Sequence, residues 1–212
     1  MRLSNPLYHS ATWPCELRDF PEWHRGRPRY GVWLLLIEQP EWLAYFHDMQ
    51  HRLRHFLHPQ TQRQAHTTLF VCGFPQAEQR FNDDVHPAKI LAQHQRLYTA
   101  QLSAFNLLLD QVDAFPTIAF ISLKGDLTPL DKIRETLNRE CAELRFAPFV
   151  PHITLGLFRD VFSAETLREA FAQLPPPPTV PCTFQRVDFA TYNAQESLGP
   201  LRVEHSVTLH RE

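Results

Sequence analysis

Two tetrapeptides in this chain of 212 residues place an imidazole and a hydroxyl at a fixed spacing, His66-Thr67-Thr68-Leu69 and His152-Ile153-Thr154-Leu155. Alternate residues of a β-strand point to the same face, so each histidine shares a face with the threonine two residues later. Chance predicts only about 0.1 copies of His-x-Thr-Leu in a chain of this composition. An imidazole can accept or donate a proton near neutral pH, and a hydroxyl can donate a hydrogen bond. The spacing therefore predicts two acid-base groups, each beside a hydrogen-bond donor.

The elements that would position these motifs repeat along the chain. Hydrophobic periodicity predicts strand, helix, strand, helix and strand over 30–38, 41–57, 65–73, 87–102 and 105–110. In the second half, strands are predicted over 117–123, 152–158, 180–192 and 202–209, and helices from Thr128 and from Ser163 onward. The order strand, helix, strand, helix, strand therefore recurs, followed by one further strand. The first strands begin 87 residues apart, and the two motif histidines are 86 apart. The pattern predicts an α+β fold, a bilobal and pseudo-symmetric duplication with antiparallel sheets flanking a central cleft.

The predicted domain organisation is an irregular leader over 1–29 and a single bilobal domain over 30–209. Its first repeat covers about 30–110 and its second about 117–209. Two helix starts are specific predictions. Thr128 to Asp131 has the spacing of a capping box with proline at the first helical position, extending to Cys141 and Leu144, and Ser163 is expected to cap the next helix.

Composition excludes several classes of protein. Lys and Arg total 21 against 23 Asp and Glu, a net charge of -2, so bulk DNA binding is not expected. No apolar run approaches the roughly 18 to 20 residues of a membrane span, and the first residues do not resemble a signal peptide. Four scattered cysteines without a C-x-x-C spacing fit neither a disulfide framework nor a zinc ribbon. We expect a cytoplasmic monomer without a membrane partner.

The paired motifs resemble those of the two-histidine phosphoesterase superfamily, whose signature is a pair of H-x-(T/S)-apolar motifs on related strands. The 2'-5' RNA ligase-like and RNA 2',3'-cyclic phosphodiesterase branch is the most similar. The resemblance extends from about Tyr30 to Leu209 and includes Gly73, Phe74 and Pro151 beside the motifs. It implies motifs that face each other across a groove and hydrolysis of a cyclic or diester phosphate without metal or other cofactor.

The resemblance assigns roles to four residues. His66 and His152 would be the acid-base pair that deprotonates water and protonates the leaving ribose oxygen. Thr68 and Thr154 would hold the phosphate through hydrogen bonds to its non-bridging oxygens. Either histidine can be the base, depending on the direction of the scissile bond. The implied substrate is a nucleotide or RNA terminus with a 2',3'-cyclic phosphate, and any ligase activity would be the reverse of ring opening.

The sequence departs from this branch where arginine often follows each motif, because Phe70 and Leu157 stand there. Strand alternation places Phe70 on the cleft face, where it could stack on a base, although packing within a lobe is the favoured interpretation. Arg159 could replace the missing charge. The cluster of Arg25, Arg27 and Arg29 could do so too, although solvated surface positions are the simpler interpretation for all four.

Other interpretations remain open at this point. His47, His51 and His55 have helical spacing that could chelate a metal, but their angles place them on a solvent face, so no metal is predicted. A metal hydrolase using these histidines is one alternative. The others are a nucleotide- or RNA-binding module without turnover and a phosphodiesterase for another substrate, such as a 2',5'-linked oligonucleotide or cyclic ADP-ribose phosphate.

Overall fold

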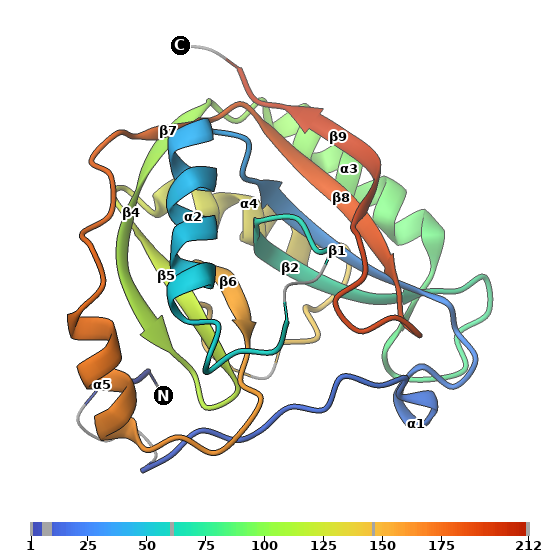
Figure 1. The fold of residues 1–212 in the computed structure, drawn as a ribbon. Helices are drawn as coiled ribbons and strands as arrows, with labels where there is room; N and C mark the ends of the chain where they lie inside the picture. The colour runs from blue at the N-terminus through green and yellow to red at the C-terminus, as the bar shows by residue number, and fades with distance from the viewer. Residues whose placement is uncertain (1, 6–9, 60–61, 146, 211–212) are drawn as a thin grey trace.

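The strands of the computed structural model form two sheets (Figure 1), and the structure describes residues 2–5, 10–59, 62–145 and 147–210. Sheet 1 has the order β3-β2-β1-β8-β9, from Asp84–Val85, His66–Pro75, Arg29–Leu36, Arg186–Asn193 and Arg202–Thr208. Sheet 2 has the order β6-β5-β4-β7, from His152–Leu157, Ile118–Lys124, Phe105–Ala114 and Cys182–Phe184. Neighbouring strands are antiparallel except β2 and β3. The predicted α+β class with antiparallel sheets is confirmed.

Each sheet contains strands from both halves of the chain. β4, the last strand of the first half, pairs with β5 of the second half, and β8 of the second half pairs with β1. The single strand expected over 180–192 is instead two strands, because β7 joins sheet 2 and β8 joins sheet 1 on either side of Gln185. The two sheets are therefore related by an exchange of strands and do not each correspond to one repeat.

The helices are α1 to α5, over Pro21–His24, Pro40–Arg52, Pro87–Ala100, Thr128–Asn138 and Ala164–Ala172. Ser163 caps α5 as predicted, since its Oγ accepts the Thr166 N–H at 3.0 Å. The predicted cap of α4 is wrong: Thr128 is already helical, and its N–H is accepted by the Asp126 carboxylate at 3.0 Å. α4 also ends before Cys141 and Leu144, and α2 ends at Arg52 rather than near residue 57.

The helices repeat the exchange seen in the strands. α2, from the first half, packs against β6 of sheet 2, and the Gln50 side chain donates to the Leu155 carbonyl at 2.8 Å. α4, from the second half, packs against β2 of sheet 1, and Arg134 Nε donates to the Leu69 carbonyl at 3.0 Å. α3 lies beside α4 and β9. Each motif strand is thus supported by a helix from the other half.

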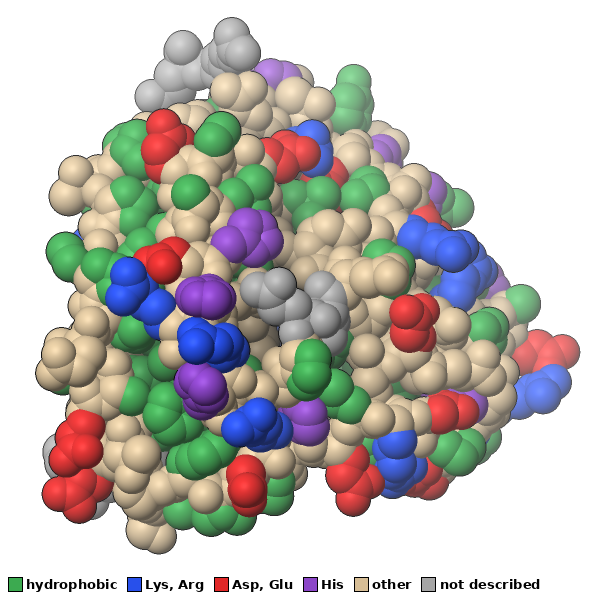
Figure 2. All heavy atoms as spheres, in the orientation of Figure 1, with side chains coloured by type: hydrophobic (Ala, Val, Ile, Leu, Met, Phe, Trp, Pro, Cys, Tyr) green, Lys and Arg blue, Asp and Glu red, His purple; other side chains and the backbone are tan. Residues whose placement is uncertain are grey.

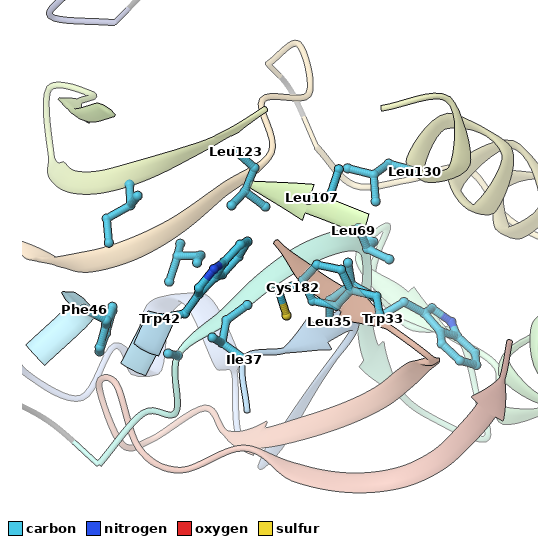
Figure 3. Packing of buried hydrophobic residues seen from close by; sticks show 14 of the residues in the cluster. Trp33, Leu35, Ile37, Trp42, Phe46, Leu69, Leu107, Leu123, Leu130 and Cys182 are labelled. Carbon is cyan, nitrogen blue, oxygen red and sulfur yellow. The ribbon is translucent and has the colours of Figure 1, made fainter. Parts of the chain in front are cut away.

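The main hydrophobic core is continuous between the two sheets and their helices. Figure 3 shows Trp33 of β1, Trp42 of α2, Leu69 of β2 and Leu107 of β4 within it. A second cluster lies on the opposite face of sheet 1 and contains Val32, Leu34, Ala190 and Leu201. Sheet 1 is consequently apolar on both faces.

The described part of the leader is packed against the domain. The Leu3 N–H donates to the Ala114 carbonyl at 2.8 Å, and the Thr12 N–H donates to the Phe162 carbonyl at 2.9 Å. Residues 1 and 6–9 of the predicted leader lie outside the described residues. No helix in the described ranges has the length and apolar character needed to cross a bilayer.

Candidate active site

The two motifs lie on strands at adjoining edges of the two sheets. β6 is an edge strand of sheet 2, and β2 is flanked on its outer side only by β3, which pairs with Phe74 and Pro75. β2 and β6 are in contact, and the Leu144 N–H donates to the Val71 carbonyl of β2 at 3.2 Å. His66 and His152 are each the first residue of their strand. Segments 86 residues apart in sequence thus meet at one place in the fold.

The fourth residue of both motifs is the extra residue of a β-bulge. Across β1 and β2, Leu34 is opposite Thr68 while Trp33 is opposite Phe70, so Leu69 has no partner of its own. Across β5 and β6, Phe120 is opposite Thr154 while Ala119 is opposite Gly156, so Leu155 has none either. A bulge bends a strand and redirects the side chains that follow it. Both leucines are buried and fix the bulges in the core.

Each motif histidine is held in one tautomer by the same local hydrogen bond. His66 Nδ1 lies 2.7 Å from the Gln64 carbonyl oxygen, and His152 Nδ1 lies 2.6 Å from that of Val150. A carbonyl oxygen only accepts, so Nδ1 carries the proton in both rings. In the neutral form Nε2 is then unprotonated, and it is the atom left to exchange protons. The two imidazoles are equivalent in position and in tautomer.

Different neighbours support the two rings. The carbonyl of Gln64 holds His66, and the side chain of Gln64 is fixed by two hydrogen bonds to the Leu201 backbone. Gln64 Nε2 donates to the Leu201 carbonyl at 3.0 Å, and the Leu201 N–H donates to Gln64 Oε1 at 2.8 Å. The His152 ring is 5.1 Å from the Phe120 ring and 5.4 Å from the Phe115 ring, measured between centroids. These contacts fix the orientation of both imidazoles.

Both histidines are shifted toward the neutral form. Burial lowers the pKa of His66 to about 4, and the nearby charges of Arg63 and His152 contribute to this shift. Burial also lowers the pKa of His152, with Arg145 adding to the effect. The charge of His152 also disfavours protonation of His66, so the two titrations are linked. Such perturbed groups are typical of functional sites.

The motif threonines share a strand face with their histidines, as predicted. Thr68 and Thr154 are half-buried, whereas Thr67 and Ile153 between the motif residues are fully buried on the opposite face. We call the face of each sheet that carries His and Thr the motif face. Residues opposite each other on neighbouring strands share a face, so Leu34, opposite Thr68, belongs to the motif face of sheet 1.

A charged network links the approach to β6 with the edge of β2. The Glu143 carboxylate accepts hydrogen bonds from Arg134 at 2.6 Å, from Arg145 at 2.8 Å and from the Val71 N–H at 3.2 Å. Arg145 also donates to the Thr68 carbonyl at 3.4 Å. Both guanidinium groups lie over the Phe149 ring, at 4.1 and 5.2 Å. This network holds a positive group beside both motifs.

Phe70 does not lie on the cleft face, and the favoured interpretation, packing within a lobe, is the one that the structure bears out. Its side chain is only 1% exposed and belongs to the main core, because the bulge at Leu69 reverses the alternation of the strand. Val71 takes the motif face instead and packs with Val32 and Leu34. Phe70 is therefore not available to stack on a base.

The leader arginines lie at the opposite end of sheet 1 from His66. Arg29 begins β1, whereas Leu36, opposite His66, ends it, and seven residues of strand span about 23 Å. Arg27 is buried and paired with Asp83 at 2.6 Å and Asp84 at 2.5 Å. Arg29 is 3.4 Å from Glu204, and Arg25 lies over the Phe81 ring. Their described partners make the cluster an anchor for the leader.

Arg159 is likewise not brought to the motif residues. It is exposed two residues after β6 ends, and its N–H donates to the Phe56 carbonyl at 3.1 Å. Seven residues separate it from His152, about 23 Å if the chain is extended. Substrate contact by Arg159 would require a ligand that reaches beyond the far end of β6.

The helix histidines do not form a metal site in the described structure. His47 and His51 are exposed on α2, but His55 lies beyond the end of this helix at Arg52, which breaks the helical spacing. Figure 2 shows histidine and basic side chains over the lower part of α2 and the chain that follows it. No group of three potential ligands with metal-binding geometry is found in the described ranges.

Sequence analysis did not single out two arginines near the motifs, Arg63 and Arg145. Arg63 precedes His66 by three residues, and Arg145 precedes His152 by seven, so the duplicated pattern gives no equivalent spacing. Their charges act on His66 and His152 respectively. Only the path of the chain before each motif places them there.

Several solved structures share this fold. Escherichia coli LigT, crystallised with 3'-AMP, matches with a TM-score of 0.57 and 17% identity over 86% of this chain and 98% of that chain. A protein from Thermus thermophilus matches with a TM-score of 0.54 and 18% identity over 86% and 99% of the two chains. A conserved protein of unknown function from Agrobacterium tumefaciens has a TM-score of 0.53 and 14% identity over 85% and 86%. The fold is thus that of LigT-like proteins.

The sequence identifies the family directly. Residues 39–196, well over half of the chain, match the model of the 2'-5' RNA ligase superfamily. The chain belongs to this superfamily, which confirms the predicted resemblance to two-histidine phosphoesterases and supports an enzyme acting on phosphodiesters. A search of curated proteins finds no match.

Proposed function

We propose that the protein hydrolyses the 2',3'-cyclic phosphate of a nucleotide or an RNA terminus to a phosphomonoester by two-histidine acid-base catalysis. The observation that carries the proposal is the matched pair of tautomers: both imidazoles use Nδ1 to bind a backbone carbonyl and keep Nε2 for proton transfer. Such a pair suits a reaction that needs one base and one acid. The bound nucleotide in E. coli LigT adds support for a nucleotide ligand.

The proposed step is an in-line displacement at phosphorus. Neutral Nε2 of one histidine takes a proton from water as the water oxygen bonds to phosphorus. The bond from phosphorus to one ribose oxygen breaks, and the protonated Nε2 of the other histidine gives its proton to that oxygen. Thr68 and Thr154 would donate hydrogen bonds to the non-bridging oxygens. No metal or other cofactor enters the step.

The cell compartment belongs to the same proposal. Cys15, Cys72, Cys141 and Cys182 are all free thiols in the structure. Free thiols suit a reducing compartment, and we infer that the enzyme acts in the cytoplasm.

The test is product analysis with 2',3'-cyclic mononucleotides and a short RNA ending in that group, in the presence of a chelator. Wild type is compared with His66→Asn, His152→Asn and the control His51→Asn, an exposed histidine of α2. Hydrolysis by wild type and the control, but not by the motif variants, is the expected result. The 2' or 3' position of the product phosphate assigns the direction of opening.

Two results would contradict the proposal. Loss of activity with chelator in wild type would indicate a metal hydrolase. Binding of the nucleotides without turnover, unchanged in the motif variants, would indicate a binding module.

A further inference from the structure

Arg63 lies against the motif face of sheet 1. It precedes β2, and its guanidinium carbon is 4.0 Å from the centroid of the Tyr192 ring on β8. Tyr192 is opposite Tyr30 of β1, and both pack with Val32 and Leu34 on the face that also carries Thr68. The side chain of Arg63 therefore lies over the apolar layer beside the first motif.

The guanidinium group has an unused donor. Its Nε is buried and has no hydrogen-bond partner among the described residues. Burial lowers the pKa of Arg63, while Tyr192, partly through a side-chain hydrogen bond, and Glu196, an exposed residue of the β8–β9 loop, favour its charged form. A buried cation with an unsatisfied N–H is costly unless an anion pairs with it. Guanidinium groups bind phosphate in particular, because their planar N–H groups match its oxygens.

The position of Arg63 complements a gap in the motifs. The bulges turn Val71 and Leu157 to corresponding places after the two motifs, and both side chains are apolar. Neither can neutralise a phosphate. Arg63 precedes the motif in sequence and brings a positive charge to the same face, close enough to lower the pKa of His66.

We propose that Arg63 binds the phosphate group of the substrate and supplies the positive charge that the positions after the motifs lack. The proposal rests on the proposed function and assigns a binding residue to it. Arg63 also links binding to protonation, because an anion that neutralises the guanidinium group relieves its repulsion of a protonated His66.

The first test measures binding without turnover. Inorganic phosphate is titrated by calorimetry into wild type, Arg63→Gln, Arg63→Lys and the control Arg139→Gln, an exposed residue at the C-terminal end of α4. Arg63→Gln should weaken binding at least about tenfold, Arg63→Lys should weaken it less, and the control should not change it. Thermal unfolding establishes that each variant is folded, and Arg63→Lys, which keeps the charge, serves if Arg63→Gln does not fold. Equal binding by wild type and Arg63→Gln, or no phosphate binding by wild type, would overturn the proposal.

The second test follows the His66 imidazole by NMR. Arg63→Gln should raise the pKa of His66 in the free protein, and phosphate should raise it in wild type at concentrations that leave it unchanged in this variant. A His66 pKa that stays the same after Arg63→Gln and after the addition of phosphate would contradict the proposed coupling. Arg63-dependent phosphate binding without hydrolysis of cyclic phosphates would refute the proposed reaction and leave the role of Arg63 intact.

Discussion

Leu69 and Leu155 occupy the same place in two β-bulges, each directly after the threonine of its motif. This equivalence explains why an apolar residue ends both motifs, since its burial fixes the bulge while histidine and threonine remain on the other face. The two leucines are 0% and 3% exposed. The motif is thus a structural unit as well as a set of functional groups.

Leu155→Ala should lower the free energy of unfolding by about 2 to 5 kcal/mol, because it leaves a cavity in the core. Alanine is still apolar and can stay buried at this position, so the bulge should persist and the folded variant should keep most of its activity. Urea denaturation and activity per folded molecule check the two parts, with Leu91→Ala, an exposed leucine, as the control. A stable Leu155→Ala that lacks activity would contradict this division of roles.

Replacing either motif histidine should reduce turnover strongly without unfolding the protein. His66→Asn and His152→Asn each remove a proton-transfer group, and we expect kcat to fall by about 10² to 10⁴. Steady-state kinetics on a 2',3'-cyclic nucleotide measures the loss. Full activity of one of the two variants would mean that the imidazoles do not act as a pair.

Thr68→Val and Thr67→Val make the same change at adjacent residues, because each replaces a hydroxyl by a methyl group. Thr68 carries the proposed phosphate donor, and its loss should lower kcat/KM by about 10 to 10³. Thr67 Oγ1 is buried without a hydrogen-bond partner in the described structure, so its replacement should keep activity and stabilise the fold by about 1 kcal/mol. Kinetics and thermal unfolding of both variants check the prediction, which equal losses of activity would contradict.

The activity should have an acidic optimum. In the proposed reaction the free enzyme needs one neutral and one protonated imidazole, a form most populated between the two pKa values. The pKa of His66 is lowered to about 4, and that of His152 is also lowered below its usual 6.5. The profile of kcat/KM should therefore be a bell with its maximum below pH 6.5. A maximum on the alkaline side of this value would show that the pair titrates differently.

Glu143→Ala should destabilise the link between the strands of the two motifs. The carboxylate is 10% exposed and neutralises Arg134 and Arg145, which are themselves only partly exposed. Its removal should cost about 2 kcal/mol or more in the free energy of unfolding, because two neighbouring cations lose their shared partner. Chemical denaturation measures the change, and Glu169→Ala on the exposed face of α5 is the control. A change no larger than that of the control would mean that the network contributes little.

The sequence alone determined the local features of this protein. The period of a strand places His66 with Thr68 and His152 with Thr154, and the cap at Ser163 depends on residues within one turn. These features depend on neighbours close in the chain, so periodicity and spacing are sufficient to predict them.

The tertiary structure decided what depends on residues far apart in the chain. β4 and β8 exchange sheets, and the bulge at Leu69 turns Phe70 into the core, because strand partners set the register. The same is true of cations: Asp83 and Asp84 neutralise Arg27 near one end of sheet 1, while Arg63 reaches Tyr192 across the motif face. The sequence shows which residues are charged. Only the fold determines that Arg27 meets two carboxylates, whereas Arg63 keeps an Nε donor without a partner among the described residues.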